Sequence, residues 1–194
     1  MIVLALDPGK QNYGFGIIEK QNRDTRGKNL LCGRLGATIT RFDEQLEALA
    51  ENYAKRIEDK IETYHPDVIV IERYMTRQSA NLNNEIVNVA IGMVVEIARR
   101  YNTKLVLVGS ATWKNYMQRV YNNNDMREVF DKAFSDHASD ALGMGIWYLD
   151  TVFETQCLKD FADSWVQKSC SNCKIVATCA RRIKADYCAR WRSA

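Results

Sequence analysis

The sequence lacks long apolar runs, low-complexity segments and internal repeats, and each absence excludes a class of protein. No stretch approaches the roughly 20 consecutive apolar residues of a membrane helix, so we expect no membrane contact. Residues 1–4 carry no basic segment or cleavage site, which makes a signal peptide unexpected and favours a reducing cytoplasm. Without repeats or biased tracts, a chain of 194 residues indicates one ordinary domain with a small appendage.

Charge is distributed unevenly along the chain, although the net charge is only +3. Residues 151–194 hold eight Lys or Arg residues against four acidic ones, whereas residues 1–150 are almost neutral. A basic appendage on a near-neutral body is compatible with a polyanionic partner, although a solvated surface has the same charge balance. We therefore divide the chain into a body, residues 1–150, and a basic tail, residues 151–194.

Hydrophobic patterning in the body predicts strands followed by alternating helices and strands. Strands are expected at about 1–7, 12–19, 30–40, 67–72 and 105–108. Helices are expected at about 42–64, 78–100, 111–120, 126–133 and 136–152. Three successive strands before the alternating part indicate an α/β fold with a mixed five-stranded sheet flanked by helices on both faces.

Two acidic residues end apolar strands of this predicted sheet. Asp7 follows the run 2–6 and precedes Pro-Gly, and Glu72 follows the run 68–71. Open α/β sheets place functional groups at the carboxyl ends of their strands, where a carboxylate stays hydrated or binds a cation. Either acid alone could be an ordinary strand-terminal residue, so the interpretation depends on a third site.

The third site is the start of the last predicted helix. His137 and Asp140 are three residues apart, on one helix face, and the small and apolar residues 141–146 would let this helix lie close to the sheet. Clustered carboxylates need a cation, and Mg²⁺ prefers carboxylate oxygens, water and phosphate. Two such ions about 3.5–4 Å apart can activate water and stabilise the leaving oxygen of a phosphodiester. His137 could instead face solvent, and Asp136 is expected to be the N-cap of the helix.

These three segments resemble the motifs of the RuvC-type Holliday-junction resolvases. The matching stretches are Leu4-Ala5-Leu6-Asp7-Pro8-Gly9 with Asn12-Tyr13-Gly14, then Val70-Ile71-Glu72, then His137-Ala138-Ser139-Asp140-Ala141-Leu142. The resemblance covers roughly residues 1–150 and implies an RNase H-like fold, a homodimer, and Mg²⁺- or Mn²⁺-dependent cutting of paired strands at a four-way junction. It also implies that Asp7, Glu72, His137 and Asp140 form the metal site.

The same resemblance suggests DNA contacts around this site. Arg73 and Tyr74 follow the second acid, where the family has an aromatic residue that reaches the opened junction; Tyr74 could equally be a partly buried loop residue. Lys114 occupies the place of basic residues after the fifth strand, either contacting the scissile phosphate or lying on the surface. Gly92 would allow close packing of the helix that corresponds to the family's dimer helix. Residues 121–126 replace a glycine- and lysine-rich family segment, so no DNA contact is transferred there.

The basic tail contains a cysteine cluster with the spacing C-x₂-C-x₅-C-x₈-C. Its members are Cys170, Cys173, Cys179 and Cys188. Four thiolates in a cytosolic chain fit a structural Zn²⁺, with a [4Fe–4S] cluster or unliganded thiols as alternatives. Basic and aromatic residues lie among them, including Arg181, Arg182 and Trp191, which suits DNA binding. The usual resolvases lack such a tail, which is compatible with a phage-type member acting in the host cytoplasm.

The sequence therefore predicts a Mg²⁺-dependent endodeoxyribonuclease that resolves Holliday junctions and related branched DNA in recombination and repair. One alternative keeps the fold but changes the substrate to an RNA–DNA hybrid, a fork or a flap. A second alternative is a non-catalytic DNA-binding scaffold that uses the zinc module. Clustered carboxylates that repel phosphate count against the scaffold, since a binding module has no use for them.

Overall fold

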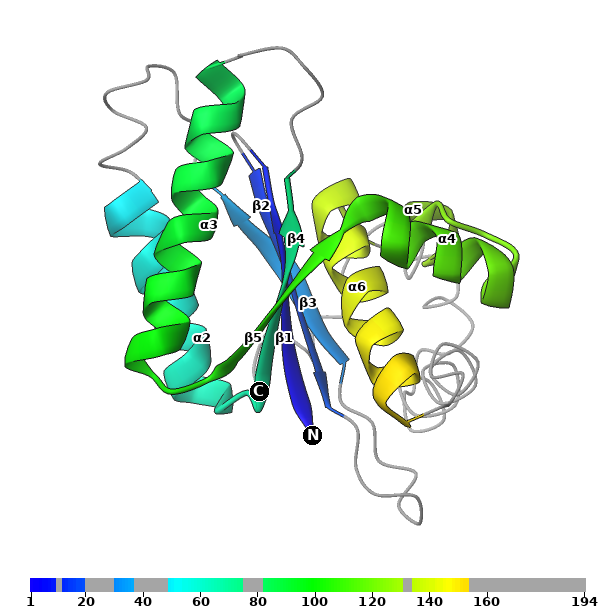
Figure 1. The fold of residues 1–194 in the computed structure, drawn as a ribbon, viewed down its shortest axis with the longest axis horizontal. Coiled ribbons are helices and arrows are strands. Elements are labelled where there is room, and N and C mark those ends of the chain that lie inside the picture. Colours follow the sequence, from blue (N-terminus) through cyan, green and yellow to red (C-terminus); the bar gives the residue numbers. More distant parts are fainter. Residues whose placement is uncertain (10–11, 20–29, 37–48, 75–81, 131–133, 154–194) are drawn as a thin grey trace, which may run out of the picture.

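The structure is a computed structural model that describes residues 1–9, 12–19, 30–36, 49–74, 82–130 and 134–153. Strands and helices alternate much as the patterning predicts (Figure 1). The strands are β1 (Ile2–Pro8), β2 (Asn12–Glu19), β3 (Leu30–Gly36), β4 (Val68–Arg73) and β5 (Lys104–Gly109). The helices are η1 (Leu49–Ala54), α2 (Lys55–Tyr64), α3 (Leu82–Arg100), α4 (Ser110–Tyr121), α5 (Met126–Val129) and α6 (Asp136–Phe153).

The strands form one five-stranded mixed sheet in the order β3-β2-β1-β4-β5. The first three strands are an antiparallel meander, and β4 and β5 run parallel to β1. The register pairs Leu6 of β1 with Ile71 of β4. The next residues along these two strands, Asp7 and Glu72, therefore reach the same edge of the sheet side by side, as the predicted fold requires.

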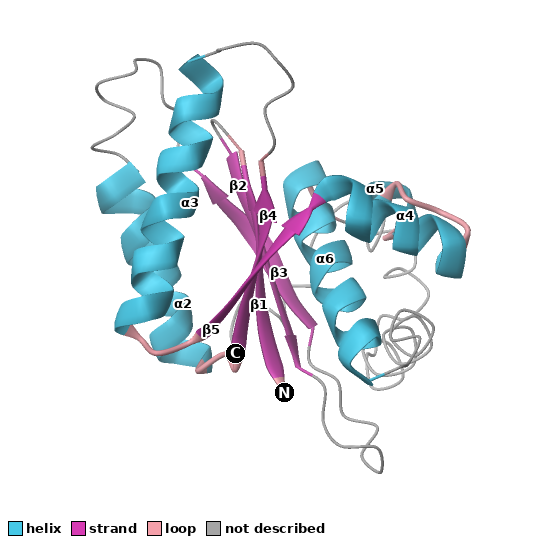
Figure 2. Cartoon of the chain, in the orientation of Figure 1, coloured by secondary structure: helices cyan, strands magenta, loops and turns pink. Residues whose placement is uncertain are grey.

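The sheet separates two hydrophobic cores, with η1, α2 and α3 on one face and α4, α5 and α6 on the other (Figure 2). Successive side chains of a strand point to opposite faces. In β1, Leu4 and Leu6 pack in the core under α2 and α3, whereas Val3 and Ala5 pack in the core under α6. By the same alternation Asp7 and Glu72 both face the layer of α4 and α6.

Several predicted bounds differ from those in the structure. The helix expected at 42–64 is described from residue 49 and opens with a π-helical segment, η1. Helix α3 is described from Leu82, and residues 75–81 lie outside the described segments. Helix α5 has only four residues, because Phe130 ends it. No helix in the described segments is both long and apolar enough to cross a membrane.

Candidate active site

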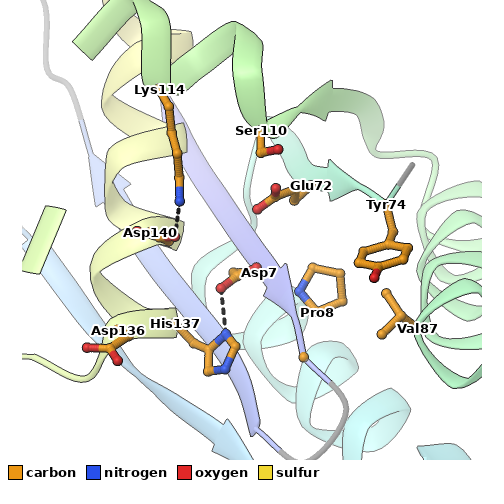
Figure 3. A pocket seen from close by; sticks show the side chains of 11 residues that line it. Asp7, Pro8, Glu72, Tyr74, Val87, Ser110, Lys114, Asp136, His137 and Asp140 are labelled. Carbon is orange, nitrogen blue, oxygen red and sulfur yellow. Dashed lines mark hydrogen bonds and ion pairs between the residues drawn. The ribbon is translucent and has the colours of Figure 1, made fainter. Parts of the chain in front are cut away.

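A pocket of about 430 Å³ opens at the carboxyl edge of the sheet, between the ends of β1 and β4 and the first turns of α4 and α6 (Figure 3). Its wall has a charged side and an apolar side. The lining residues are Asp7, Pro8, Gly9, Glu72, Tyr74, Val87, Ser110, Lys114, Asp136, His137 and Asp140. All five residues that the sequence predicts as catalytic therefore face one space, although they come from four separate elements.

His137 is held against the first acid. Its Nδ1 lies 2.7 Å from Oδ2 of Asp7, and both side chains are mostly buried. This hydrogen bond to Asp7 raises the pKa of His137 above its ordinary value, against the opposing effect of burial. The prediction that His137 lies in the site rather than in solvent agrees with this position.

Lys114 forms an ion pair with the third acid. Its Nζ donates to Oδ2 of Asp140 at 2.9 Å. Burial would lower the pKa of Lys114, but the bond to Asp140 and the charges of the three acids outweigh burial and raise it. Burial also raises the pKa of Asp140, despite the opposing effect of Lys114. The neighbouring Trp113 is fully buried, so it anchors this turn of α4 and fixes the base of the Lys114 side chain.

The pKa of Glu72 is shifted more strongly than that of Asp140. Burial, followed by the negative charge of Asp7, raises the pKa of Glu72 to about 7. Lys114 and a hydrogen bond with Ser110 act in the opposite direction, and Asp140 adds to the repulsion. Sequence reasoning does not find Ser110, because its contact with Glu72 depends on how α4 follows β5. The pKa of Glu72 is thus set first by its burial and then by the charge of the neighbouring acids.

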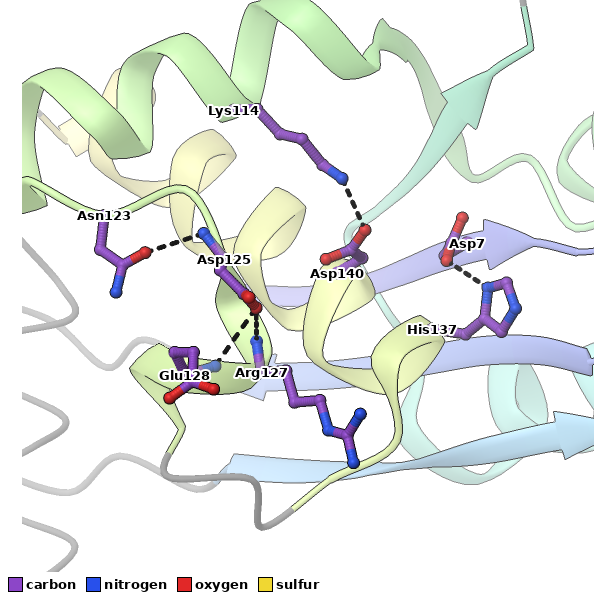
Figure 4. Close-up of polar contacts among 8 residues, drawn as sticks. All are labelled: Asp7, Lys114, Asn123, Asp125, Arg127, Glu128, His137 and Asp140. Atoms are coloured by element: carbon purple, nitrogen blue, oxygen red, sulfur yellow. Dashed lines mark hydrogen bonds and ion pairs between the residues drawn. The ribbon is translucent and has the colours of Figure 1, made fainter.

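A second pocket of about 440 Å³ adjoins the first and shares Lys114, Asp136 and Asp140 with it. Arg127 lies in this pocket and pairs with Asp136 at 3.1 Å. Asp125 fixes the other wall, because its Oδ1 accepts from the backbone N–H groups of Arg127 and Glu128 and so caps α5 (Figure 4).

One predicted helix cap is wrong by one position. Helix α6 begins at Asp136, so this residue lies in the first turn instead of preceding it. At this position the negative charge of Asp136 is stabilised by the positive, N-terminal end of the helix dipole. Its side chain is 72% exposed and pairs with Arg127.

The donor set suits a hard divalent cation. Four carboxylates, those of Asp7, Glu72, Asp136 and Asp140, and the imidazole of His137 line the pocket. Within the described segments, no three His, Cys, Asp or Glu side chains are gathered tightly enough to enclose an ion. Asp7 and Asp140 are instead paired with His137 and Lys114, so in this arrangement protein cations partly balance the acids.

The other predicted site residues fall into two groups. Arg73 and Tyr74 are exposed at the end of β4, and Tyr74 lies over Val87 beside Pro8 on the apolar side of the pocket (Figure 3). The residues predicted in the tail lie outside the described segments: Cys170, Cys173, Cys179, Cys188, Arg181, Arg182 and Trp191.

Comparison with known proteins connects this site to one family. The sequence model described as "Crossover junction endodeoxyribonuclease RuvC" matches residues 3–147. RuvC of Geobacter sp. (strain M21) is 25% identical over 170 residues, covering 82% of this chain and 98% of the relative. RuvC of Saccharopolyspora erythraea is 29% identical over a shorter stretch, 41% of this chain and 38% of the relative.

Solved structures of low sequence identity share the fold. Thermus thermophilus RuvC superposes with a TM-score of 0.60 at 16% identity, covering 80% of this chain and 98% of the other. The yeast mitochondrial Holliday junction resolvase Ydc2 superposes with a TM-score of 0.51 at 13% identity, covering 82% and 83% of the two chains. The mixed sheet flanked by helices is therefore an established architecture, and the predicted fold class is confirmed.

Proposed function

Since the chain belongs to the RuvC family of crossover junction endodeoxyribonucleases, we propose that it resolves four-way DNA junctions by metal-dependent hydrolysis of phosphodiester bonds. The observation that carries the proposal is the convergence of Asp7, Glu72, His137, Asp140 and Lys114 on one pocket. Thermus thermophilus RuvC and the yeast mitochondrial Holliday junction resolvase Ydc2 share the fold on which this pocket is built. The chain spans 38% of the length of RuvC of Saccharopolyspora erythraea and 37% of that of Janthinobacterium sp. (strain Marseille).

We infer that Asp7, Glu72, Asp140 and His137 would hold Mg²⁺ or Mn²⁺, with two ions as the expected number. Oxygen donors dominate this set, and hard divalent cations prefer them. When bound, such ions activate the attacking water and stabilise charge on the leaving oxygen. The reaction breaks the bond between phosphorus and the 3′ oxygen, leaving a 3′ hydroxyl and a 5′ phosphate, with no covalent intermediate.

The protein side chains orient the reactants and balance their charge. Lys114 is free to exchange its bond to Asp140 for one to a phosphate oxygen, because its side chain is 38% exposed at the pocket wall. His137 fixes the orientation of the Asp7 carboxylate by donating to it, provided that Nδ1 carries the proton. Fixed orientations of this kind reduce the reorganisation needed during the reaction.

Tyr74 is proposed to stack on a base of the opened junction. Its ring is 45% exposed at the rim of the pocket, and base stacking on an aromatic ring contributes about 1–3 kcal/mol. We expect Tyr74→Ala to weaken junction binding by about tenfold and Tyr74→Phe to preserve it, as measured by titration of a labelled junction under conditions without cleavage. Equal binding by Tyr74→Ala and the wild-type chain would contradict the stacking role.

The outer face of α3 is proposed as the homodimer interface. Val89 and Val95 are 40% and 42% exposed there, and Gly92 between them has no atom within 4 Å of its missing side chain. These residues are spaced by three, so they form one apolar stripe with a flat centre against which a second copy can pack closely.

Disrupting this apolar stripe of α3 should separate the two protomers, so that the two strands of a junction are no longer cut together. Val95→Glu is expected to give monomers by light scattering and unpaired nicks on a junction, because resolution needs two active sites. Val152→Glu is the matched control, since Val152 is similarly exposed, at 45%, but lies on α6 in the other helical layer. A dimeric Val95→Glu variant with paired cuts would contradict this interface.

The basic tail is proposed to bind Zn²⁺ through Cys170, Cys173, Cys179 and Cys188 and to add a DNA contact through its Lys and Arg residues. The four-thiolate spacing supports the metal, and the charge excess supports the contact. Metal analysis of the purified full chain distinguishes Zn²⁺ from an iron–sulfur cluster.

The proposed substrate is tested by comparing cleavage of a four-way junction, a replication fork and an RNA–DNA hybrid at matched salt. We expect symmetric cuts on the junction at the highest rate. Preferred cleavage of the hybrid would identify an RNase H-type enzyme, and binding without cleavage would identify a scaffold.

A further inference from the structure

Gly14 of β2 lies where the strand carrying Asp7 meets the first turn of α6. The antiparallel register pairs Gly14 directly with Asp7. Directly opposed residues of an antiparallel pair face the same side of the sheet, so the missing side chain of Gly14 and the carboxylate of Asp7 both face α6. The residue is therefore next to the site without lining the pocket.

The backbone of His137 fills the space of that missing side chain. A Cβ atom at Gly14 would lie 2.1 Å from the carbonyl oxygen of His137 and 2.3 Å from its carbonyl carbon. Backbone atoms cannot rotate away as a side-chain end can, so any side chain at position 14 must push the first turn of α6 away from the sheet. Restoring ordinary contact distance requires a shift of about 1 Å.

Gly16, two residues further along the same strand and on the same face, behaves differently. Its added Cβ would approach the Cδ2 atom of Leu142 most closely, at 2.9 Å, and this is the end of a flexible side chain. The backbone of α6 thus lies much closer to the added Cβ at Gly14, 2.1 Å at His137, than at Gly16, where the nearest backbone atom is the N of Leu142 at 3.2 Å. Gly16→Ala therefore tests crowding of the same helix at a point removed from the site.

The geometry assigns to Gly14 the role of a positioning residue, one that sets the distance of His137 and Asp140 from Asp7; this assignment rests on the metal-dependent function proposed above. His137 and Asp140 lie within the first five residues of α6, so a displacement of this end of the helix moves both together. Nδ1 of His137 and Oδ2 of Asp7 are 2.7 Å apart, so a shift of about 1 Å would break the hydrogen bond between them. Displacement of about 1 Å at a reacting centre can cost about 10²-fold in rate.

The test uses metal binding by the free protein as well as activity. The chain has only two histidines, and His65 follows α2, at the edge of the sheet where β4 begins. Mn²⁺ bound in the site broadens the ring signals of His137 in NMR spectra, and His65 serves as the internal reference. In the wild-type chain we expect selective broadening of His137.

In Gly14→Ala the Mn²⁺ concentration for half-maximal broadening of the His137 signals is expected to rise about tenfold. The kcat for junction cleavage should fall about 10²-fold, and the affinity for the junction should change little. Gly16→Ala should lose less thermal stability, because its closest contact is the end of a flexible side chain, and should keep both values within about threefold. Gly14→Ala that matches the wild-type chain in Mn²⁺ broadening overturns the assignment. Equal losses in both variants also overturn it, because they would show general destabilisation.

If Gly14→Ala does not fold, Gly145→Ala moves the same helix by another contact. Its added Cβ would meet Cδ1 of Ile18 at 2.4 Å and Cβ of Ala5 at 3.3 Å. A rise of about fivefold in the Mn²⁺ concentration for half-maximal broadening is expected, smaller than for Gly14→Ala because Ile18 can adjust; a rise within the threefold limit of Gly16→Ala overturns the assignment. Selective Mn²⁺ broadening without cleavage of any branched DNA would reject the proposed function alone. Absence of selective broadening in the wild-type chain would overturn the role of Gly14.

Discussion

Replacing Asp7 with asparagine is expected to lower the rate of junction cleavage by about 10³-fold or more, while junction binding stays intact. Asp7 lies at the centre of the site, opposite His137 and next in register to Glu72. Asparagine keeps the shape and can still accept a hydrogen bond, but it removes the charge that a divalent cation needs. Binding is expected to persist because DNA affinity depends mainly on phosphate contacts, which this change does not remove.

The matched control for this variant is Asp59→Asn. Asp59 is exposed on α2, in the helical layer on the opposite face of the sheet, so the same charge is removed far from the pocket. Single-turnover cleavage and junction binding are measured for both variants at saturating Mg²⁺. Cleavage at the wild-type rate by Asp7→Asn would contradict the proposed role of Asp7 in metal binding. An equal loss of cleavage rate in both variants would show an effect of net charge alone.

Replacing Glu72 with glutamine should abolish cleavage to a similar degree, about 10³-fold, but stabilise the metal-free fold. The pKa of Glu72 is raised to about 7 in the folded chain, so ionising this group in the fold is unfavourable. Glutamine has the same size and can keep the contact with Ser110, yet it carries no charge. The free energy of unfolding should rise on the order of 1–2 kcal/mol at pH 8, allowing for partial solvent screening.

The pH dependence of this stabilisation has a definite sign. Below pH of about 4.5 the carboxyl group is protonated in both the folded and the unfolded chain, so glutamine gives no advantage. Between about 4.5 and 7 the unfolded chain releases the proton while the folded chain retains it, so the wild type loses stability as pH rises. Above about 7 the difference stays constant.

Thermal unfolding in EDTA at pH 5 and pH 8 measures this effect. The difference in melting temperature between Glu72→Gln and the wild type should be larger at pH 8 than at pH 5 by a few degrees. For a chain of this size, a change of 1 kcal/mol shifts the melting temperature by about 2–4 °C. Added Mg²⁺ should narrow the gap by stabilising the wild type alone. A gap that is the same at both pH values would contradict the proposed repulsion among the acids.

The sequence predicts Asp7 and Glu72 well because each follows an uninterrupted apolar strand. Their adjacency then depends only on parallel pairing of β1 with β4, which strand order along the chain already suggests. His137 and Asp140 are predicted from helical spacing and from the motif resemblance. Local patterns of this kind predict the structure well because the apolar side chains that define them also form the core.

Contacts between distant segments could not be predicted in the same way. The hydrogen bond of Ser110 to Glu72 depends on the direction in which α4 leaves β5. The role of Gly14 depends on how deeply α6 sits on the sheet, a distance that no spacing of residues encodes. The start of α6 at Asp136 is predicted correctly, but the N-cap role of this residue is not, because Asp136 is compatible both with an N-cap and with a first helical turn.

The central claim is that the carboxylate pocket performs metal-dependent resolution of four-way junctions. The most direct measurement incubates the full chain with a synthetic junction labelled on each strand, with and without Mg²⁺, and maps the cuts. We predict symmetric cuts on two opposing strands, leaving 5′ phosphates, only when Mg²⁺ is present and only when Asp7 is intact. Cutting that continues in EDTA or in the Asp7→Asn variant, or no cutting of the junction at all, would contradict the claim.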